Sequence, residues 1–238
     1  MSDLIAELRS RGVYRTGHFR LSSGRHSDTY LQCALALQDP VFAAELGRSL
    51  AARLSAAGIG AETVASPAIG GLLAGFVVAS AFGARFVFTE RVDGVMALRR
   101  GQSVASGERV VVIEDVLTTG RSAQEAAAVL ETRGAVVVGY GAIVDRSSRE
   151  QQLPFAAHSL VRVEILTWEG SDCLLCSAGE PLQVPGSRGA GLATEGRRAG
   201  GAFSQGNGAA VERAEATATA SVPESLKYRA LYPTPSGD

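Results

Sequence analysis

The sequence predicts an α/β fold in which helices cover both faces of a parallel β-sheet. Three observations support this class. Short runs rich in Val and Ile alternate with helix-length segments from residue 62 onward. These runs are almost continuously apolar, which is typical of strands that are buried on both faces. The length of 238 residues and the 46% hydrophobic content suit one domain, with or without a tail.

The first sixty residues predict two helices with extended chain between them. Apolar side chains recur at helical spacing over residues 3–11 and 40–57. Short extended pieces lie around Phe19 and Tyr30. This part of the chain precedes the predicted sheet.

The predicted sheet begins at about residue 61. Strand-like and helix-like segments follow one another in the order ETVAS, GLLAGFVVASAFG, ARFVFTE, RVVVIED, SAQEAAAVLETRG and AVVVGYGAIVD. Ligands of such sheets bind where the carboxyl ends of the strands open into a crevice. We therefore expect the functional residues in the loops that follow these strands.

The last part of the chain, residues 189–238, has a different composition. It is rich in Gly, Ala, Ser and Thr and has almost no apolar periodicity, so we expect a disordered tail. Only the patch SLKYRALYP at residues 225–233 has apolar side chains that favour docking. A passive tail is the favoured interpretation.

The charge and the cysteine content exclude several classes of protein. A net charge of -1 does not favour a dedicated nucleic-acid or membrane-surface binder. No apolar run is long enough to cross a bilayer, and the acidic N-terminal stretch is unlike a secretory signal, so we expect a cytoplasmic protein. Three unevenly placed cysteines are too few for a disulfide framework.

The basic residues are almost all arginine, because Lys227 is the only lysine among 23 basic residues. Walker-type phosphate loops, Schiff-base enzymes and kinases need a lysine at a defined place, so these classes are excluded. The three histidines are far apart and show no metal-binding spacing. Cys173 and Cys176 form a lone CxxC, which is weak support for zinc, and two reduced, partly buried cysteines are the favoured interpretation.

The strongest motif is VVVIEDVLTTGRS at residues 110–122. Glu114 and Asp115 end a buried strand, where adjacent carboxylates repel each other unless they meet hydroxyls, a cation or a metal. Residues 118–122 then offer hydroxyls and free amides at a helix N-terminus, which suits an anion such as phosphate. The combination predicts a phosphorylated sugar as ligand. The alternative is an ordinary strand-to-helix turn with Thr as the helix cap.

This motif resembles the signature of the type I phosphoribosyltransferases. The resemblance implies a Rossmann-like parallel sheet flanked by helices, with a small N-terminal hood and helices at residues 1–60 and the core sheet at residues 61–188. It also implies that phosphoribosyl pyrophosphate is bound, with the acid pair on the ribose hydroxyls and the following turn around the ribose phosphate. The implied binding residues are Ile69, Gly70, Glu114, Asp115, Val116, Leu117, Thr118, Thr119, Gly120, Arg121 and Ser122.

Four further segments resemble the orotate phosphoribosyltransferases, and the resemblance runs from residue 1 to about residue 188. The segments are SSGRHSDTY at 22–30, SPAIGG at 66–71, ERVDGVMALRRG at 90–101 and VDR at 144–146. The resemblance implies that Thr118 and Arg146 contact orotate and that Tyr30 and Leu31 line its pocket. Ile69 and Gly70 would lie beside the pyrophosphate. An arginine also suits the orotate carboxylate chemically, because it offers a bidentate, charge-assisted partner.

The segment 90–101 is expected to be a charged, glycine-containing loop between two strands, and long polar loops are often functional. In the family such a loop closes over the pyrophosphate, often in the neighbouring subunit, which implies a homodimer. Arg91, Arg99 and Arg100 are therefore candidate catalytic residues together with Asp115. Many relatives carry lysines where this chain has Ser22 and Val95.

The implied reaction is transfer of the phosphoribosyl group to orotate, which gives orotidine monophosphate and pyrophosphate in pyrimidine synthesis. The expected cofactor is Mg²⁺, held mainly by substrate oxygens and water, with no protein ligand assigned. Two alternatives stay open. One is a phosphoribosyltransferase for a purine base, and the other is a non-catalytic regulator that senses phosphoribosyl pyrophosphate.

Overall fold

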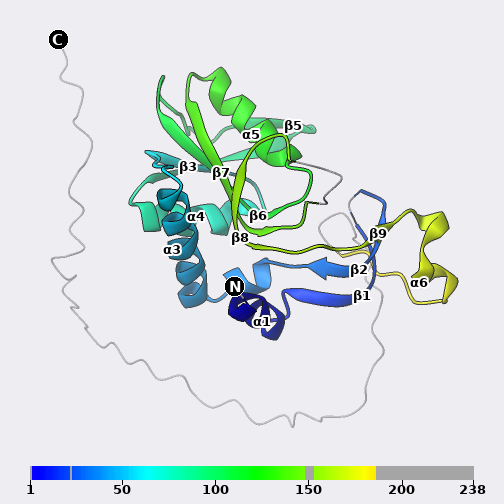
Figure 1. Cartoon of the computed structure of the whole chain (residues 1–238). Helices are drawn as coiled ribbons and strands as arrows, with labels where there is room; N and C mark the ends of the chain where they lie inside the picture. Colours follow the sequence, from blue (N-terminus) through cyan, green and yellow to red (C-terminus); the bar gives the residue numbers. More distant parts are fainter. Residues whose placement is uncertain (1, 22, 148–152, 186–238) are drawn as a thin grey trace, which may run out of the picture. The chain divides into compact units, whose positions relative to one another are not determined.

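The computed structural model describes residues 2–21, 23–147 and 153–185, with the side chains of residues 2 and 3 left aside. The predicted tail at 189–238 and Ser22 lie outside the described residues. The described chain forms two sheets and the helices that pack on them (Figure 1).

The longer helices are α1 (Ser2–Ser10), α3 (Pro40–Ala56), α4 (Gly71–Phe82) and α5 (Arg121–Thr132), and the short ones are α2 (Ala34–Leu37), the 3₁₀ turn η1 (Gly170–Asp172) and α6 (Leu174–Ser177). The strands are β1 (Tyr14–Arg20), β2 (His26–Leu31), β3 (Thr63–Pro67), β4 (Arg85–Val92), β5 (Val95–Leu98), β6 (Arg109–Leu117), β7 (Val136–Asp145), β8 (Ala157–Arg162) and β9 (Thr167–Trp168). The predicted helices and strands through β7 occur in the predicted order, and the structure adds α2, β5, β8, β9, η1 and α6.

The core sheet has six strands in the order β5-β4-β3-β6-β7-β8. All neighbouring pairs are parallel except β4 and β5, which are antiparallel. The α/β prediction is therefore confirmed, with one antiparallel edge strand. The central strand β6 runs between β3 and β7, so its carboxyl end lies in the middle of the sheet edge.

Alternation along β6 explains why helices cover both faces of the sheet. Val111 and Ile113 belong to the cluster that contains the buried side chains of α3 and α4. Val110 and Val112 belong to the cluster that contains the buried side chains of α5. All four are at most 1% exposed. Each fully buried side chain of this kind contributes about 1.5–3 kcal/mol, so the strand is anchored from both sides before its polar end begins.

Helix α4 packs unusually close to β3 because glycine occupies the contact. A Cβ atom at Gly75 would lie 1.9 Å from Ser66 Oγ and 2.7 Å from the Phe86 ring. Ser66 is fully buried on β3 and cannot retreat into solvent. The absence of a side chain at Gly75 therefore fixes the distance between helix and sheet.

The segment 90–101 differs from the predicted loop. Glu90 pairs with Ala97 and Val92 pairs with Val95, so most of the segment is a β-hairpin formed by the end of β4 and all of β5. The turn consists of Asp93 and Gly94, both at positive φ. Charged side chains on an edge hairpin resemble a loop in composition, which is why the sequence pattern was misleading here.

The second sheet is antiparallel, with the order β1-β2-β9. We refer to this sheet with α1 as the hood. Its third strand comes from residues that follow the core sheet in sequence, because His26 pairs with Trp168 and Ser27 with Thr167. The chain thus returns to the hood after β8, although sequence order alone groups residues 61–188 with the core sheet.

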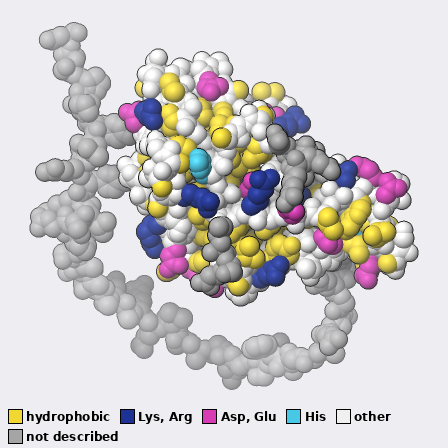
Figure 2. All heavy atoms as spheres, in the orientation of Figure 1, with side chains coloured by type: hydrophobic (Ala, Val, Ile, Leu, Met, Phe, Trp, Pro, Cys, Tyr) yellow, Lys and Arg dark blue, Asp and Glu magenta, His cyan; other side chains and the backbone are white. Residues whose placement is uncertain are grey.

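The described surface agrees with the balanced composition. Side chains of both charge signs are scattered over the face shown in Figure 2. Among the described residues, no helix combines the length and the apolar character that a membrane span requires.

We expect Gly75→Ala to destabilise the fold because the added methyl group overlaps Ser66 Oγ. Overpacking of this kind costs about 1–3 kcal/mol, which lowers the melting temperature by several degrees. The control is Gly60→Ala, where an added Cβ meets nothing within 4 Å. Calorimetry of both variants checks the idea, and equal melting temperatures would show that α4 can shift freely on the sheet.

Candidate active site

The acid pair lies at the carboxyl end of the central strand. Glu114 and Asp115 are half-buried, and within the described part of the chain neither carboxylate pairs with another side chain. Burial raises the pKa of Glu114 well above its ordinary value, and the charge of Asp115 adds to this shift. Burial also raises the pKa of Asp115, although backbone amides oppose the shift. The pair is therefore strained electrostatically and suited to an added polar or cationic partner.

Two glycines at the start of α4 approach the acids. A Cβ atom at Gly70 would lie 2.9 Å from Asp115 Oδ1, and one at Gly71 would lie 3.1 Å from Glu114 Oε2. A larger residue at either position would push the carboxylates away. The segment SPAIGG thus meets the acid pair, with a cis peptide bond between Ala68 and Ile69 and the Ile69 side chain 81% exposed.

The turn after β6 ends at the N-terminus of α5. Gly120 is the N-cap residue and has φ 72°, a left-handed conformation that favours glycine. A Cβ there would also lie 2.8 Å from the Phe155 ring. The neighbouring Thr118 and Thr119 are exposed. The first amides of a helix lack intrahelical acceptors, so this turn can hold an anion.

Arg146 lies beside this turn. Its backbone amide donates to the carbonyl of Leu117 at 2.9 Å, which places it next to Thr118. The Arg146 side chain is half-buried, and burial lowers its pKa. Among the described residues, the ionic partner of Asp145 is Arg162, at 3.8 Å, and not Arg146. Arg146 is thus not engaged in a surface ion pair with its neighbour Asp145.

The hood supplies Tyr30 to the same region. Burial raises the pKa of Tyr30 and the charge of Asp115 adds to the rise, whereas Arg146 and Arg15 oppose it. Tyr30 therefore lies within electrostatic range of all three groups. Leu31, in contrast, is 8% exposed and packs in the core, so its side chain supports the strand.

Two residues near this region have no counterpart in the sequence motifs. Arg15 is the cross-strand partner of Tyr30 on β1. The Cys33 thiol donates to the Asp115 carbonyl at a long 3.9 Å, and burial raises its pKa. The only sequence signal for Arg15 was its own positive charge near the N-terminus. Nothing in the sequence indicated Cys33.

The predicted loop arginines are engaged in ion pairs along the hairpin. Arg91 pairs with Glu125 of α5. Arg100 makes two hydrogen bonds to Glu90, at 3.1 and 2.9 Å, and Arg99 lies 3.8 Å from the same carboxylate. Among described residues, none of the three contacts the acid pair.

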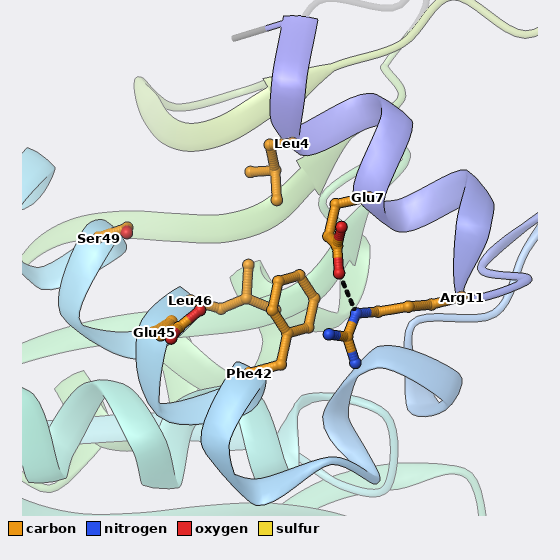
Figure 3. A pocket seen from close by; sticks show the side chains of 7 residues that line it. All are labelled: Leu4, Glu7, Arg11, Phe42, Glu45, Leu46 and Ser49. Carbon is orange, nitrogen blue, oxygen red and sulfur yellow. Dashed lines mark hydrogen bonds and ion pairs between the residues drawn. The ribbon is translucent and has the colours of Figure 1, made fainter.

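A pocket away from these motifs lies between α1 and α3 (Figure 3). The cation in its lining is already engaged, because Arg11 donates to Glu7 at 2.7 Å and stacks on the Phe42 ring at 3.9 Å. We therefore do not assign chemistry to this pocket.

The arrangement at the end of β6 combines three chemical capabilities. The acid pair can accept hydrogen bonds from two hydroxyls, and the N-terminus of α5 can bind a phosphate. Arg146 and Tyr30 flank the same strand end and can contact a planar anionic molecule. The described residues thus bring together most of the predicted binding set and leave the hairpin arginines apart from it.

Comparison with known proteins agrees with this geometry. The family model described as phosphoribosyl transferase domain matches residues 36–170. The orotate phosphoribosyltransferase of Chlorobium phaeobacteroides is 45% identical over 180 residues, which are 76% of this chain and 92% of the relative. That of Nitratiruptor sp. is 47% identical and covers 79% of this chain and 99% of its own length.

A solved structure resembles the fold as well. The Mycobacterium tuberculosis orotate phosphoribosyltransferase, in complex with 5-phospho-α-D-ribosyl 1-diphosphate, superposes with a TM-score of 0.50 at 26% identity. The match covers 67% of this chain and 94% of that one. A family-model match over more than half of the chain, together with relatives of such identity, shows that the chain belongs to the phosphoribosyltransferase family and, within it, to the orotate phosphoribosyltransferases.

Proposed function

We propose that the protein transfers the phosphoribosyl group from phosphoribosyl pyrophosphate to a ring nitrogen of orotate. The products are orotidine monophosphate and pyrophosphate, as in de novo pyrimidine synthesis. The observation that carries the proposal is the unpartnered acid pair of β6, which leads directly into the glycine turn and the N-terminus of α5. The membership in the orotate phosphoribosyltransferases supports the choice of base.

The reaction needs positioning and electrostatic stabilisation more than covalent chemistry. As the bond to pyrophosphate breaks, positive charge grows on the sugar and negative charge grows on the leaving group. In the proposed complex, Glu114 and Asp115 accept hydrogen bonds from the ribose hydroxyls and lie near the growing positive charge. Residues 118–122 hold the ribose phosphate through hydroxyls and amides, and Gly70 lies beside the pyrophosphate.

The base site is proposed to lie between β7 and the hood. Arg146 pairs with the orotate carboxylate, and Tyr30 covers the ring. The support is the backbone bond from Arg146 to Leu117 and the electrostatic proximity of Tyr30 to both Arg146 and Asp115. A neutral purine would leave the half-buried Arg146 without an anionic partner, which favours orotate.

We also propose Mg²⁺ as the cofactor. The donor set fits, because Glu114 and Asp115 are carboxylates without side-chain partners among the described residues, and a hard cation prefers oxygen. The ion would be held mainly by substrate oxygens and water, with the acid pair close by. When bound, it supplies positive charge to the leaving pyrophosphate.

The hairpin β4–β5 is proposed to act on the leaving group in a homodimer. This hairpin carries Arg91, Arg99 and Arg100. Their ion pairs with Glu125 and Glu90 are exposed or half-buried. Exposed pairs are weak, typically about 0–1 kcal/mol, so exchange of a carboxylate for a pyrophosphate costs little. In this proposal the hairpin reaches the site of the neighbouring subunit.

The direct test is the loss of orotate in the presence of phosphoribosyl pyrophosphate, with and without Mg²⁺. We expect formation of orotidine monophosphate only when all three are present. Adenine, hypoxanthine and uracil serve as competing bases in parallel reactions. Faster use of a purine than of orotate would reject the proposed base.

Asp115→Asn is expected to weaken the use of phosphoribosyl pyrophosphate by about one to two decades, because a hydrogen bond to a charged group contributes about 1.5–3 kcal/mol. The fold should be stabilised at neutral pH. The raised pKa values mean that these carboxyl groups bind protons more tightly in the folded state than in the unfolded chain. The free energy of unfolding therefore declines as the pH rises above the ordinary carboxyl pKa range.

Removal of one acid should flatten that decline. Substrate titration and melting curves between acidic and neutral pH measure both effects. Glu131→Gln, an exposed acid-to-amide change on α5, is the matched control. Unchanged substrate use in Asp115→Asn would mean that the acid pair serves only the structure.

Arg146→Ala is expected to reduce reaction with orotate by two or more decades and to leave the binding of phosphoribosyl pyrophosphate within a few fold. Loss of a charge-assisted partner in a closed site costs about 2–5 kcal/mol. Uracil lacks the carboxylate and should be affected much less. Kinetics with both bases, beside the exposed control Arg48→Ala on α3, separate the cases, and an equal loss for both bases contradicts the role.

A further inference from the structure

Four side chains that the proposed reaction does not use converge in the hood. His18 comes from β1 and His26 begins β2. Cys173 is the N-cap residue of the short helix α6, and Cys176 lies within that helix. One potential ligand atom from each residue lies within 4.8 Å of the other three. His18 and Cys173 are separated by 155 residues in sequence, so only the return of the chain to the hood brings them together.

The distances within this cluster agree with a tetrahedral metal site. His18 Nε2 lies 3.1 Å from His26 Nδ1, 3.4 Å from Cys173 Sγ and 3.6 Å from Cys176 Sγ. Cys176 Sγ lies 3.2 Å from His26 Nδ1. A tetrahedral zinc ion with bonds of about 2.0–2.1 Å to nitrogen and about 2.3 Å to sulfur places two nitrogens about 3.3 Å apart and nitrogen and sulfur about 3.6 Å apart.

The hydrogen bonding of His18 also favours a cation. Its Nδ1 atom lies 2.8 Å from the Glu180 carbonyl, which can only accept, so Nδ1 carries the proton. In the neutral ring, Nε2 then has no proton and offers one lone pair. The three polar atoms around it belong to His26, Cys173 and Cys176. A single lone pair can accept only one hydrogen bond, so it leaves the other close contacts unexplained, whereas one cation satisfies all four groups. A backbone carbonyl that orients a histidine in this way is typical of metal sites.

The segment that carries the cysteines has almost no core of its own. From residue 166 to residue 185, where every residue is described, only Cys173 is buried. Leu166 and Leu174 are 65% and 68% exposed, and Leu182 is 40% exposed. Hydrophobic side chains are visible on the surface of this lobe in Figure 2, at the place where Figure 1 shows α6. Small segments without a core are commonly held by a structural metal.

We propose that His18, His26, Cys173 and Cys176 bind one structural Zn²⁺ ion that fastens the segment 166–185 to the hairpin β1–β2. Two thiolates and two imidazoles at tetrahedral spacing suit zinc among the common metals. With four protein ligands the site has no open position, which indicates a structural ion and not a catalytic one. Cys176 is exposed and gives the metal an entry path.

The site has a consequence for the hood. Tyr30 follows His26 by four residues on β2, so the ion would fix the strand that presents Tyr30. The segment is also linked to the hairpin by the pairing of β9 with β2, by hydrogen bonds from Arg25 to Thr167 and from Ser27 to Leu166, and by backbone hydrogen bonds of Gln183. These links lie on either side of α6, so loss of the ion should loosen the part around α6 first.

The proposal is tested on the full-length protein, produced with zinc in the growth medium and passed through metal-free buffer. Elemental analysis should find about one zinc ion per chain, as expected for a closed four-ligand site. Replacement by Co²⁺ should give the absorption of a tetrahedral thiolate site. A strong chelator should lower the melting temperature, and added Zn²⁺ should restore it.

Matched variants locate the ion. Cys173→Ser with Cys176→Ser, and separately His26→Ala, should reduce the zinc content to below about a tenth of an ion per chain. Cys33→Ala and His158→Ala remove the other cysteine and the other histidine, neither of which belongs to the cluster, and should keep the zinc. These readouts do not involve orotate, so they are independent of the proposed activity.

The chelation and cobalt measurements use the unmodified chain, so the test does not depend on the folding of any variant. Absence of zinc from the protein after incubation with a slight excess of Zn²⁺ would overturn the proposal. The same holds if the double cysteine variant retains zinc, or if mass analysis shows a disulfide between Cys173 and Cys176 in the freshly purified protein.

Discussion

Two adjacent, half-buried carboxylates at the end of the central strand are the constraint around which this molecule is arranged. Burial raises the pKa of both Glu114 and Asp115 and so disfavours their charged forms, and the charge of Asp115 adds to the rise at Glu114. The apolar part of β6 is held from both faces by hydrophobic clusters, which supply the stability that keeps the acids in place. The acid pair is thus locally unfavourable, and the hydrophobic clusters on both faces of β6 offset its cost.

The surrounding loops are adapted to this pair. Gly70 and Gly71 approach the carboxylates closely, because a Cβ atom would lie 2.9 Å from Asp115 at the first position and 3.1 Å from Glu114 at the second. Gly120 adopts a left-handed conformation that turns the chain from β6 into α5. Backbone groups therefore surround the acids at short range, which suits the binding of a highly charged sugar phosphate and leaves little room for side-chain variation.

The hood and the core meet at this strand end and play different roles. The core positions the acids, the anion-binding turn and Arg146 with regular secondary structure. The hood presents Tyr30 on β2, which pairs with β1 along its length and with β9 at its start. The segment that contains β9 and α6 buries little apolar surface. The proposed metal ion, bound by Cys173 and Cys176 of the segment and by His18 and His26 of the hairpin, would fasten it to the strand that carries Tyr30.

The sequence by itself determined the α/β class, the acid pair, the glycine turn and the position of Arg146 after β7, because these follow from periodicity and from local strand-to-helix signals. The tertiary structure decided what depends on pairing between distant segments. Polar composition suggested a loop at 90–101, yet cross-strand pairing from Glu90 to Ala97 makes it a hairpin. The burial of the Leu31 side chain in the core also follows from strand geometry, because β2 places that side chain inward. The cluster of His18 and His26 with the CxxC could not be found by spacing along the chain, since only the pairing of β9 with β2 closes the distance of more than 140 residues between its halves.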